Sequence, residues 1–378
     1  MDTATTIVFV AVIAARFLVP LLIPVVPLPA IVAALVLDAA DQTIFQAFGY
    51  DPPGYQSYDK AMDVYYQAIA YLAALRNWTD PGALSIARFL FFYRQSGVVL
   101  FELLQWRPLL LIFPNTFEYF FIAYEIVRLR WNPRRPFRFW LIVAAAIWIF
   151  VKLPQEYWIH VAQLDVTDTV AAHPEATVVL AVVVAVVAFT AWRLLSPRVP
   201  APDHAWRVVA DPLPEEIDTV AQRDAWHVRH GQVLSADTVE KVFLVGLLSV
   251  IYAEVLPGST ASSLATFLGV AAFVLVNTMI TLWVARRYRS VEPVLGAFAA
   301  RLALNVALVF VADRLLPRPE GDIDLGPTLF IVVLLSLLTL LDDRFRPVAA
   351  VRADRRVDAP PGPPGPPEPR PRDTALGG

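Results

Sequence analysis

The sequence predicts an all-α, polytopic integral membrane protein with about 10–11 transmembrane helices. Of the 378 residues, 57% are hydrophobic and only 17% are charged, and the mean hydropathy is +0.55. Ordinary soluble domains contain about 25% charged residues. The apolar residues form long runs, many of which reach the roughly 20 residues that a helix needs to cross a bilayer. These features exclude a cytosolic enzyme, a secreted disulfide scaffold and a nucleic-acid-binding protein.

Six apolar segments come first along the chain. Helices are expected over 7–26, 30–48, 58–76, 84–104, 109–128 and 139–153. The first segment has no basic stretch ahead of it and carries Arg16 inside, so it is predicted to be a retained helix and not a cleaved signal peptide. A second group of helices is expected over 177–195, 242–256, 264–284, 291–311 and 325–341.

Composition divides the chain into five parts. They are a six-helix membrane core (1–155), an extracytoplasmic loop with one transmembrane helix (156–195), a polar cytoplasmic linker (196–238), a four-helix membrane region (239–343) and a disordered, Pro-rich tail (344–378). The tail is expected to be solvated and cytoplasmic, and binding of a protein module of the SH3 type is the alternative.

Arginine-rich loops predict the orientation in the cell membrane. They lie at 128–138, 286–289 and 344–356, and the positive-inside rule places all three in the cytoplasm. The chain has no cysteine, which excludes a thiolate metal site or a cysteine nucleophile. The net charge of −3 is too small to indicate a polyanionic partner, so membrane lipids are the expected surroundings.

Two pairs of aspartates carry most of the chemical information. Asp38 and Asp41 are three residues apart on one helix, and Asp59 and Asp63 are four apart on the next, so each pair shares a helical face. The sequence GYDPPG between them predicts a turn. An antiparallel hairpin brings the four carboxylates together near a membrane surface. There they must be neutralised by protons or by a hard divalent cation such as Mg²⁺ or Mn²⁺.

The aspartate spacing resembles the signature of the CDP-alcohol phosphotransferases, D-x-x-D-G-x-x-A-R, eight residues, then G-x-x-x-D-x-x-x-D. All four acidic positions are present. The resemblance implies a six-helix catalytic core that transfers a phospho-alcohol group from a CDP-linked lipid donor to an alcohol acceptor. It further implies that Asp38, Asp41 and Asp59 hold Mg²⁺ or Mn²⁺, with Asp63 in the same metal site as the general base.

The non-acidic motif positions differ from that family. Gln42, Phe45, Gln46 and Tyr55 stand where the signature has Gly, Ala, Arg and Gly. Larger side chains would fill the space that the nucleotide needs. The pattern therefore indicates that the metal-binding aspartates are retained and that the CDP site is altered or lost. The alternatives are an ion-coupled transporter that uses the aspartates as a cation or proton site, and a catalytically inert scaffold. A homodimer is also expected.

Topology adds a second difference. Counting helices back from the arginine-rich loop at 128–138 puts the turn at 49–54 outside the cell, whereas CDP-linked donors are cytoplasmic. A transferase therefore requires one segment not to cross the membrane. The segment 84–104 is the candidate, because it carries Arg88, Arg94 and Glu102.

Three further polar residues are candidate substrate contacts. Glu118 and Glu125 are seven apart in the fifth segment, and Arg94 is an intramembrane cation that can meet a phosphate. The alternative for the glutamates is a buried stripe that locks helices together, and for Arg94 an ion pair. Arg301 in the second group is expected to pair with an acidic partner.

Overall fold

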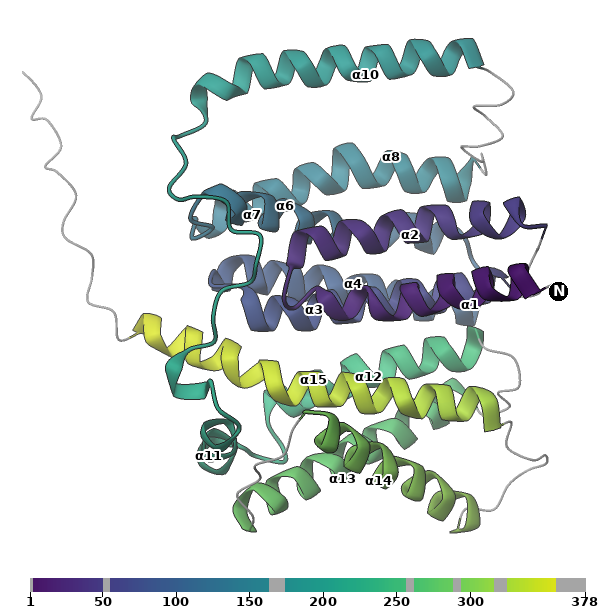
Figure 1. The fold of residues 1–378 in the computed structure, drawn as a ribbon, viewed down its shortest axis with the longest axis vertical. Helices are drawn as coiled ribbons and strands as arrows, with labels where there is room; N and C mark the ends of the chain where they lie inside the picture. The colour runs from purple at the N-terminus through teal and green to yellow at the C-terminus, as the bar shows by residue number, and fades with distance from the viewer. Residues whose placement is uncertain are drawn as a thin grey trace, which may run out of the picture.

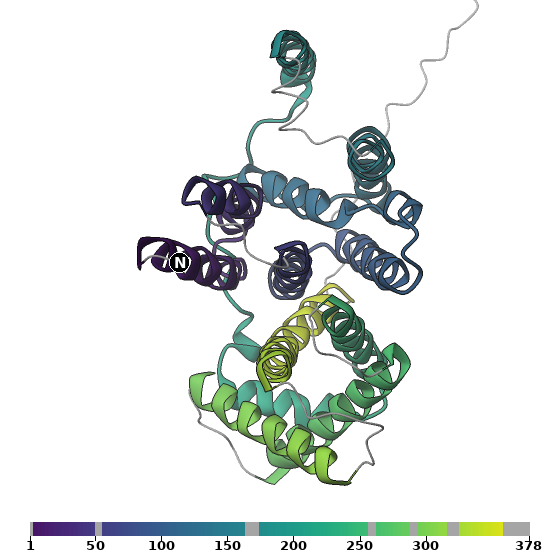
Figure 2. The same ribbon diagram turned by 90° about the vertical axis from the view of Figure 1, so that its right-hand side faces the viewer.

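The computed structural model describes residues 3–49, 55–162, 174–255, 262–287, 294–315 and 325–357. Within these ranges the regular structure is entirely helical, which confirms the predicted all-α class (Figure 1). Most helices run nearly parallel or antiparallel to one another, and Figure 2 shows many of them end-on.

The N-terminal group comprises the helices from α1 to η3. Their bounds are α1 Thr3–Leu18, η1 Pro20–Leu22, α2 Pro27–Ala47, α3 Tyr55–Asn77, α4 Pro81–Leu104, α5 Pro108–Ile112, α6 Thr116–Arg130, α7 Phe137–Ile147, η2 Trp148–Lys152, α8 Leu153–Glu156 and η3 Tyr157–Val161. Several of these helices begin with proline. The first N–H groups of a helix have no acceptor within the helix, so proline, which lacks an N–H, costs no hydrogen bond there. The Asp80 side chain also caps α4 by accepting from Ala83 N at 2.9 Å.

The fifth and sixth predicted segments are irregular and not single α-helices. The chain breaks between α5 and α6 at residues 113–115, where Pro114 lacks the N–H that would continue the helix. The break lies close against α4, because a Cβ on Gly97 would lie 2.1 Å from Phe113 Cβ. In the sixth segment and just after it, η2 and η3 are π-helical turns on either side of α8.

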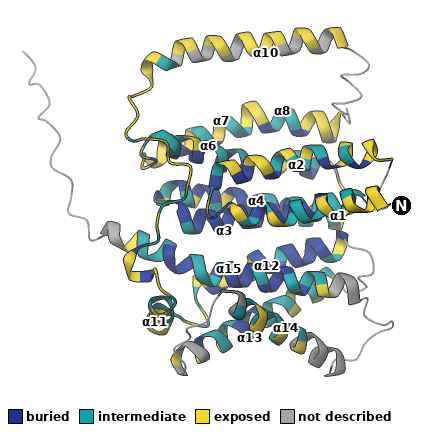
Figure 3. Ribbon diagram, in the orientation of Figure 1, coloured by how far each residue is buried: buried dark blue, intermediate teal, exposed yellow. Residues whose placement is uncertain are grey.

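Helix α10 stands apart from the other helices and precedes the C-terminal group. The bounds of α10 and of the elements that follow it are α10 Pro174–Leu195, η4 Ser196–Arg198, η5 Glu215–Ile217, α11 Val220–His230, α12 Ala236–Val255, α13 Ser263–Arg287, α14 Val294–Leu315 and α15 Leu325–Val357. Figures 1 and 2 show α10 beside the bundle, and Figure 3 shows its described side chains mostly exposed. Residues 163–173 of the predicted extracytoplasmic loop lie outside the described residues.

Two predictions for the polar parts of the chain need correction. The predicted linker contains α11, which begins with a capping box between Thr219 and Gln222. The predicted tail begins inside α15, which continues past Arg344 to Val357. The helix persists because Arg346 binds Asp342 one turn earlier, with Nε 3.1 Å from Oδ1, and packs into the C-terminal group. The Pro-rich run itself lies outside the described residues.

Five helical stretches in the described residues are long and apolar enough to cross a membrane. They are Thr3–Leu22, Pro27–Ala47, Pro108–Arg130, Phe137–Ile159 and Ser263–Trp283. The central helix α3 is not among them, and nearly all its side chains from Ala61 to Leu75 are buried by protein (Figure 3). A helix surrounded by other helices can carry more polar residues than one that faces lipid.

The N-terminal group has two distinct ends. At one end, the segment that follows α10 binds the turn after η1, where Ala210 N donates to Val25 O at 2.8 Å, and the end of α6, where Arg207 N donates to Leu129 O at 3.0 Å. The turn after α6 also binds the turn after α3, because Arg135 N donates to Asp80 Oδ2 at 3.0 Å. At the other end, Lys60 Nζ near the start of α3 lies 3.0 Å from Glu102 Oε1 near the end of α4. Helix α4 thus runs the full distance between the ends, and it is not among the five stretches that are long and apolar enough to cross a membrane.

Buried charges join the two helical groups. Helix α12 packs against α3 and α4, and α15 packs against α3. Glu240 on α12 accepts from the Tyr71 hydroxyl and lies 3.1 Å from Arg88 and 3.2 Å from Arg346. The prediction that Arg301 pairs with an acid is confirmed, because its guanidinium lies 2.6 Å from Asp343.

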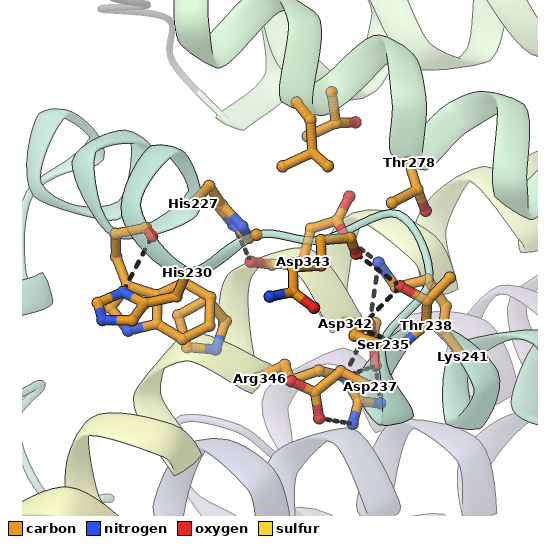
Figure 4. A pocket seen from close by; sticks show the side chains of 16 residues that line it. His227, His230, Ser235, Asp237, Thr238, Lys241, Thr278, Asp342, Asp343 and Arg346 are labelled. Atoms are coloured by element: carbon orange, nitrogen blue, oxygen red, sulfur yellow. Dashed lines mark hydrogen bonds and ion pairs between the residues drawn. The ribbon is translucent and has the colours of Figure 1, made fainter.

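A polar pocket of about 80 Å³ lies beside this network, between α11, α12, α13 and α15 (Figure 4). Lys241 binds Asp343 on its floor, and His227 Nε2 lies 3.1 Å from the backbone oxygen of Asp343. The pocket is at the same end as the arginine-rich turns, and its charged groups largely satisfy one another.

Candidate functional site

The four aspartates converge, as their spacing predicts. Asp38 and Asp41 lie on the second half of α2, and Asp59 and Asp63 lie on the first turns of α3. Asp38, Asp59 and Asp63 each offer a carboxylate oxygen, and these atoms lie within 4.8 Å of one another. We call the four residues the aspartate cluster. It lies toward the end of the N-terminal group that is opposite the arginine-rich turns (Figure 1).

A single arginine binds all four carboxylates. Arg16 on α1 is buried, and its guanidinium donates to Asp38 and to Asp41. The same group donates to Asp59 at 2.9 Å and to Asp63 at 3.4 Å. Helix α1 packs against α2 and α3 and so brings Arg16 to the depth of the cluster. The sequence analysis missed this role, although an arginine in an apolar segment was its signal.

The cluster has a closed side and an open side. The Asp41 side chain is completely buried, and the Tyr55 hydroxyl donates to it as well. The side chains of Asp38, Asp59 and Asp63 keep 26%, 34% and 36% of their exposure. A ligand can therefore reach the last three carboxylates, whereas Asp41 serves to hold Arg16.

Charge in the cluster is not balanced by its own residues. Four carboxylates and one guanidinium leave three negative charges when all are ionised. Protons or a bound cation must compensate them, because carboxylates crowded together repel one another. The hydroxyl of Tyr58, whose ring lies 5.4 Å from Arg16, is buried without a hydrogen-bond partner among the described residues. An all-oxygen donor set with an orphaned hydroxyl beside it fits one hard cation such as Mg²⁺ or Mn²⁺.

Two of the four altered motif positions fill the space beside the closed side, and the other two, Gln42 and Gln46, do not. Phe45 is buried, and its ring meets Tyr55 edge-on at 6.4 Å between centroids and Phe9 at 5.4 Å. Gln42 and Gln46 are exposed on α2. Aromatic rings thus occupy the positions where the phosphotransferase signature has small residues.

The three candidate substrate residues do not join the aspartate cluster. Arg94 donates to the backbone oxygen of Phe113 at 2.9 Å, in the break between α5 and α6. Glu125 is bound by Arg128 at 2.6 Å and by Trp78 Nε1 at 2.9 Å, close to the arginine-rich end. These contacts agree with the alternative in which such residues lock helices together. Glu118 accepts from Tyr66 on α3, one turn beyond Asp63.

No protein-family model matches the chain, and no curated protein or solved structure matches it. The chemistry of the aspartate cluster therefore has to be inferred from its own geometry.

Proposed function

We propose that this chain is a polytopic membrane protein that transports a cation, and that the aspartate cluster is where the cation binds. The observation that carries the proposal is the charge of the cluster. One guanidinium faces four carboxylates, and the three exposed carboxylates lie on a single open side. Such a site attracts a hard divalent cation and holds it through oxygen ligands.

The position of the cluster supports transport more than transfer from a nucleotide. It lies at the end of the bundle away from residues 128–138, which the positive-inside rule assigns to the cytoplasm. The cluster would then open to the extracytoplasmic side. A CDP-linked donor is confined to the cytoplasm, whereas a metal ion is available on both sides.

Arg16 gives the cluster a resident counter-charge. It keeps the carboxylates together between binding events, and its positive charge weakens the attraction for an incoming cation. A transport site must bind strongly enough to load and weakly enough to release. A cage with four aspartates and no arginine would hold a divalent cation much more tightly.

The irregular helices of the fifth and sixth segments are a second feature typical of transporters. Non-helical backbone at membrane depth is tolerated where it is buried in protein or lines a cavity. Discontinuous helices also place ion sites in many secondary transporters. Here the break between α5 and α6 and the π-helical turns around α8 lie in two of the five stretches that are long enough to cross a membrane.

A second candidate function is transfer of a phospho-alcohol group, as in the CDP-alcohol phosphotransferases. The convergence of all four motif aspartates favours it. Asp38 and Asp59 would hold Mg²⁺ or Mn²⁺, which would polarise the phosphate, and Asp63 is exposed enough to take a proton from an acceptor hydroxyl. This function requires the cluster to face the cytoplasm.

Uptake of Mn²⁺ into liposomes that contain the purified protein tests the proposal. We expect uptake by the wild type and loss of uptake in Asp63→Asn, with Glu215→Gln, an exposed carboxylate on η5, as the matched control. Turnover of a CDP-linked lipid without Mn²⁺ uptake would establish the second candidate instead. The absence of both activities would leave the scaffold alternative.

A further inference from the structure

Glu118 is a buried carboxylate that has only neutral hydrogen-bond donors. It lies in the first turn of α6, directly after the break, and is 5% exposed. The Tyr66 hydroxyl and Asn115 Nδ2, the latter at 2.9 Å, both donate to its Oε2. No cation forms an ion pair with Glu118 in the described part of the chain.

The charged groups around Glu118 are committed to other partners. Lys152 in η2 donates to Gln155 Oε1 at 2.9 Å and lies 3.6 Å from Glu156 Oε1. Arg94 on α4 donates to the backbone oxygen of Phe113. The positive charge of Lys152 and the negative charge of Asp38 on α2 both act on Glu118 without forming an ion pair with it in the described residues. An ionised carboxylate without a direct ion pair is expensive to bury, and taking up a proton removes that expense.

The structure provides a hydrogen-bond arrangement for both protonation states. Asn115 Oδ1 and Thr116 Oγ1 are buried without a hydrogen-bond partner in the described structure. While Glu118 is ionised, it accepts from Asn115 Nδ2. Once it is protonated, rotation of the amide by about half a turn presents Asn115 Oδ1 to the new O–H group, since an amide offers a donor and an acceptor at similar positions. Tyr66 can donate to Glu118 in either state.

We propose that Glu118 is a proton-binding site at the break between α5 and α6, and that it releases a proton when a cation loads the aspartate cluster. Binding of the proton is independent of the proposed function, whereas its coupling to the cation rests on that function. Tyr66 connects the two sites, because it lies one helical turn beyond Asp63 on α3 and contacts Glu118. Residues of α2, α3, α4 and η2 lie around the site, where Glu118 is 5% exposed.

Infrared difference spectroscopy of the purified protein tests proton binding. Spectra recorded at low and high pH contain a carbonyl band for each carboxylic acid that titrates. We expect one band of the wild type to disappear in Glu118→Gln, to shift in Glu118→Asp and to remain in Glu125→Gln. Glu125 is the matched control, because it is buried on the same helix but paired with Arg128. A spectrum that is unchanged in Glu118→Gln would overturn the proposal.

Proton release on metal binding tests the coupling. Mn²⁺ is added to the protein in weakly buffered detergent with a pH indicator, and the protons released per bound Mn²⁺ are counted. We expect Glu118→Gln to release about one proton fewer per bound Mn²⁺ than the wild type. Glu125→Gln should release the same number as the wild type. Equal counts in Glu118→Gln and wild type would overturn the coupling. If the wild type binds no Mn²⁺, the proposed function fails, and the infrared band still decides whether Glu118 binds a proton.

Discussion

Arg16 on α1 and Asp59 on α3 are joined by an ion pair of 2.9 Å. The same guanidinium binds the two aspartates of α2, so one side chain fixes the relative positions of three helices. It occupies the centre of a cluster that, judged from the sequence, would be neutralised by protons or by a divalent cation. The proposed cation site is therefore the open face of an arginine-centred cluster.

Replacing Arg16 should destabilise the protein and make it depend on metal. Arg16→Gln leaves four carboxylates with no counter-charge, and removing one partner of a buried ion pair costs about 3–5 kcal/mol. We expect a lower melting temperature in detergent, and Mg²⁺ or Mn²⁺ should raise it more in the variant than in the wild type. Arg134→Gln, at an exposed position, is the control. Equal effects of metal on both proteins would contradict the cluster as a cation site.

The closed and open sides of the cluster should respond differently to substitution. Asp63→Asn removes an exposed ligand, so Mn²⁺ affinity measured by electron paramagnetic resonance should fall at least about tenfold. Asp41→Asn removes the completely buried partner of Arg16 and Tyr55, so it should mainly lower thermal stability. The distinction fails if both variants lose affinity and stability to the same extent.

The side of the membrane that the cluster faces can be measured directly, because the chain contains no cysteine. Lys60, beside Asp59, is 43% exposed. We expect Lys60→Cys to react with an impermeant thiol reagent in intact cells, and Arg134→Cys in the arginine-rich turn to react only after lysis. The reverse pattern would place the cluster in the cytoplasm and favour the transferase.

Acid should weaken the charge network of the C-terminal group at a defined pH. Asp343 lies beyond the apolar run that ends at Leu341. Burial opposes its ionisation, but the charges of Lys241 and Arg301 hold the pKa of its carboxyl well below the usual range. A carboxyl with a lowered folded-state pKa contributes stability above its unfolded pKa of about 3.9, and that stability is lost as the pH falls toward the folded value.

Asp343→Asn should therefore lower thermal stability by a constant amount between about pH 8 and pH 5, and by less below about pH 4. Melting temperatures of wild type and variant across this range are the measurement. Asp354→Asn, at an exposed position on α15, is the control. A penalty that grows as the pH falls would show that Asp343 is not held in the ionised form.

Much of the fold followed from local pattern. Each expected apolar segment is helical in the described residues, because a long apolar run bounded by proline, glycine or charge has few other solutions. The exceptions are the turn at the end of the first segment, the break before Thr116, the π-helical turns after Ile147 and the length of α15. The break follows from Pro114, a local signal, whereas α15 is extended partly by the contact of Arg346 with Glu240, a residue distant in sequence.

Local pattern was enough to predict the helical class, the apolar segments and the convergence of Asp38, Asp41, Asp59 and Asp63, because helical periodicity puts each pair on one face of its helix. Two features became apparent only from the packing of the helices: Arg16 lies among the four carboxylates, and Glu118 is buried with no ion pair in the described residues. Helical spacing places residues on a face of their own helix. Which charge meets them from another helix depends on how the helices pack.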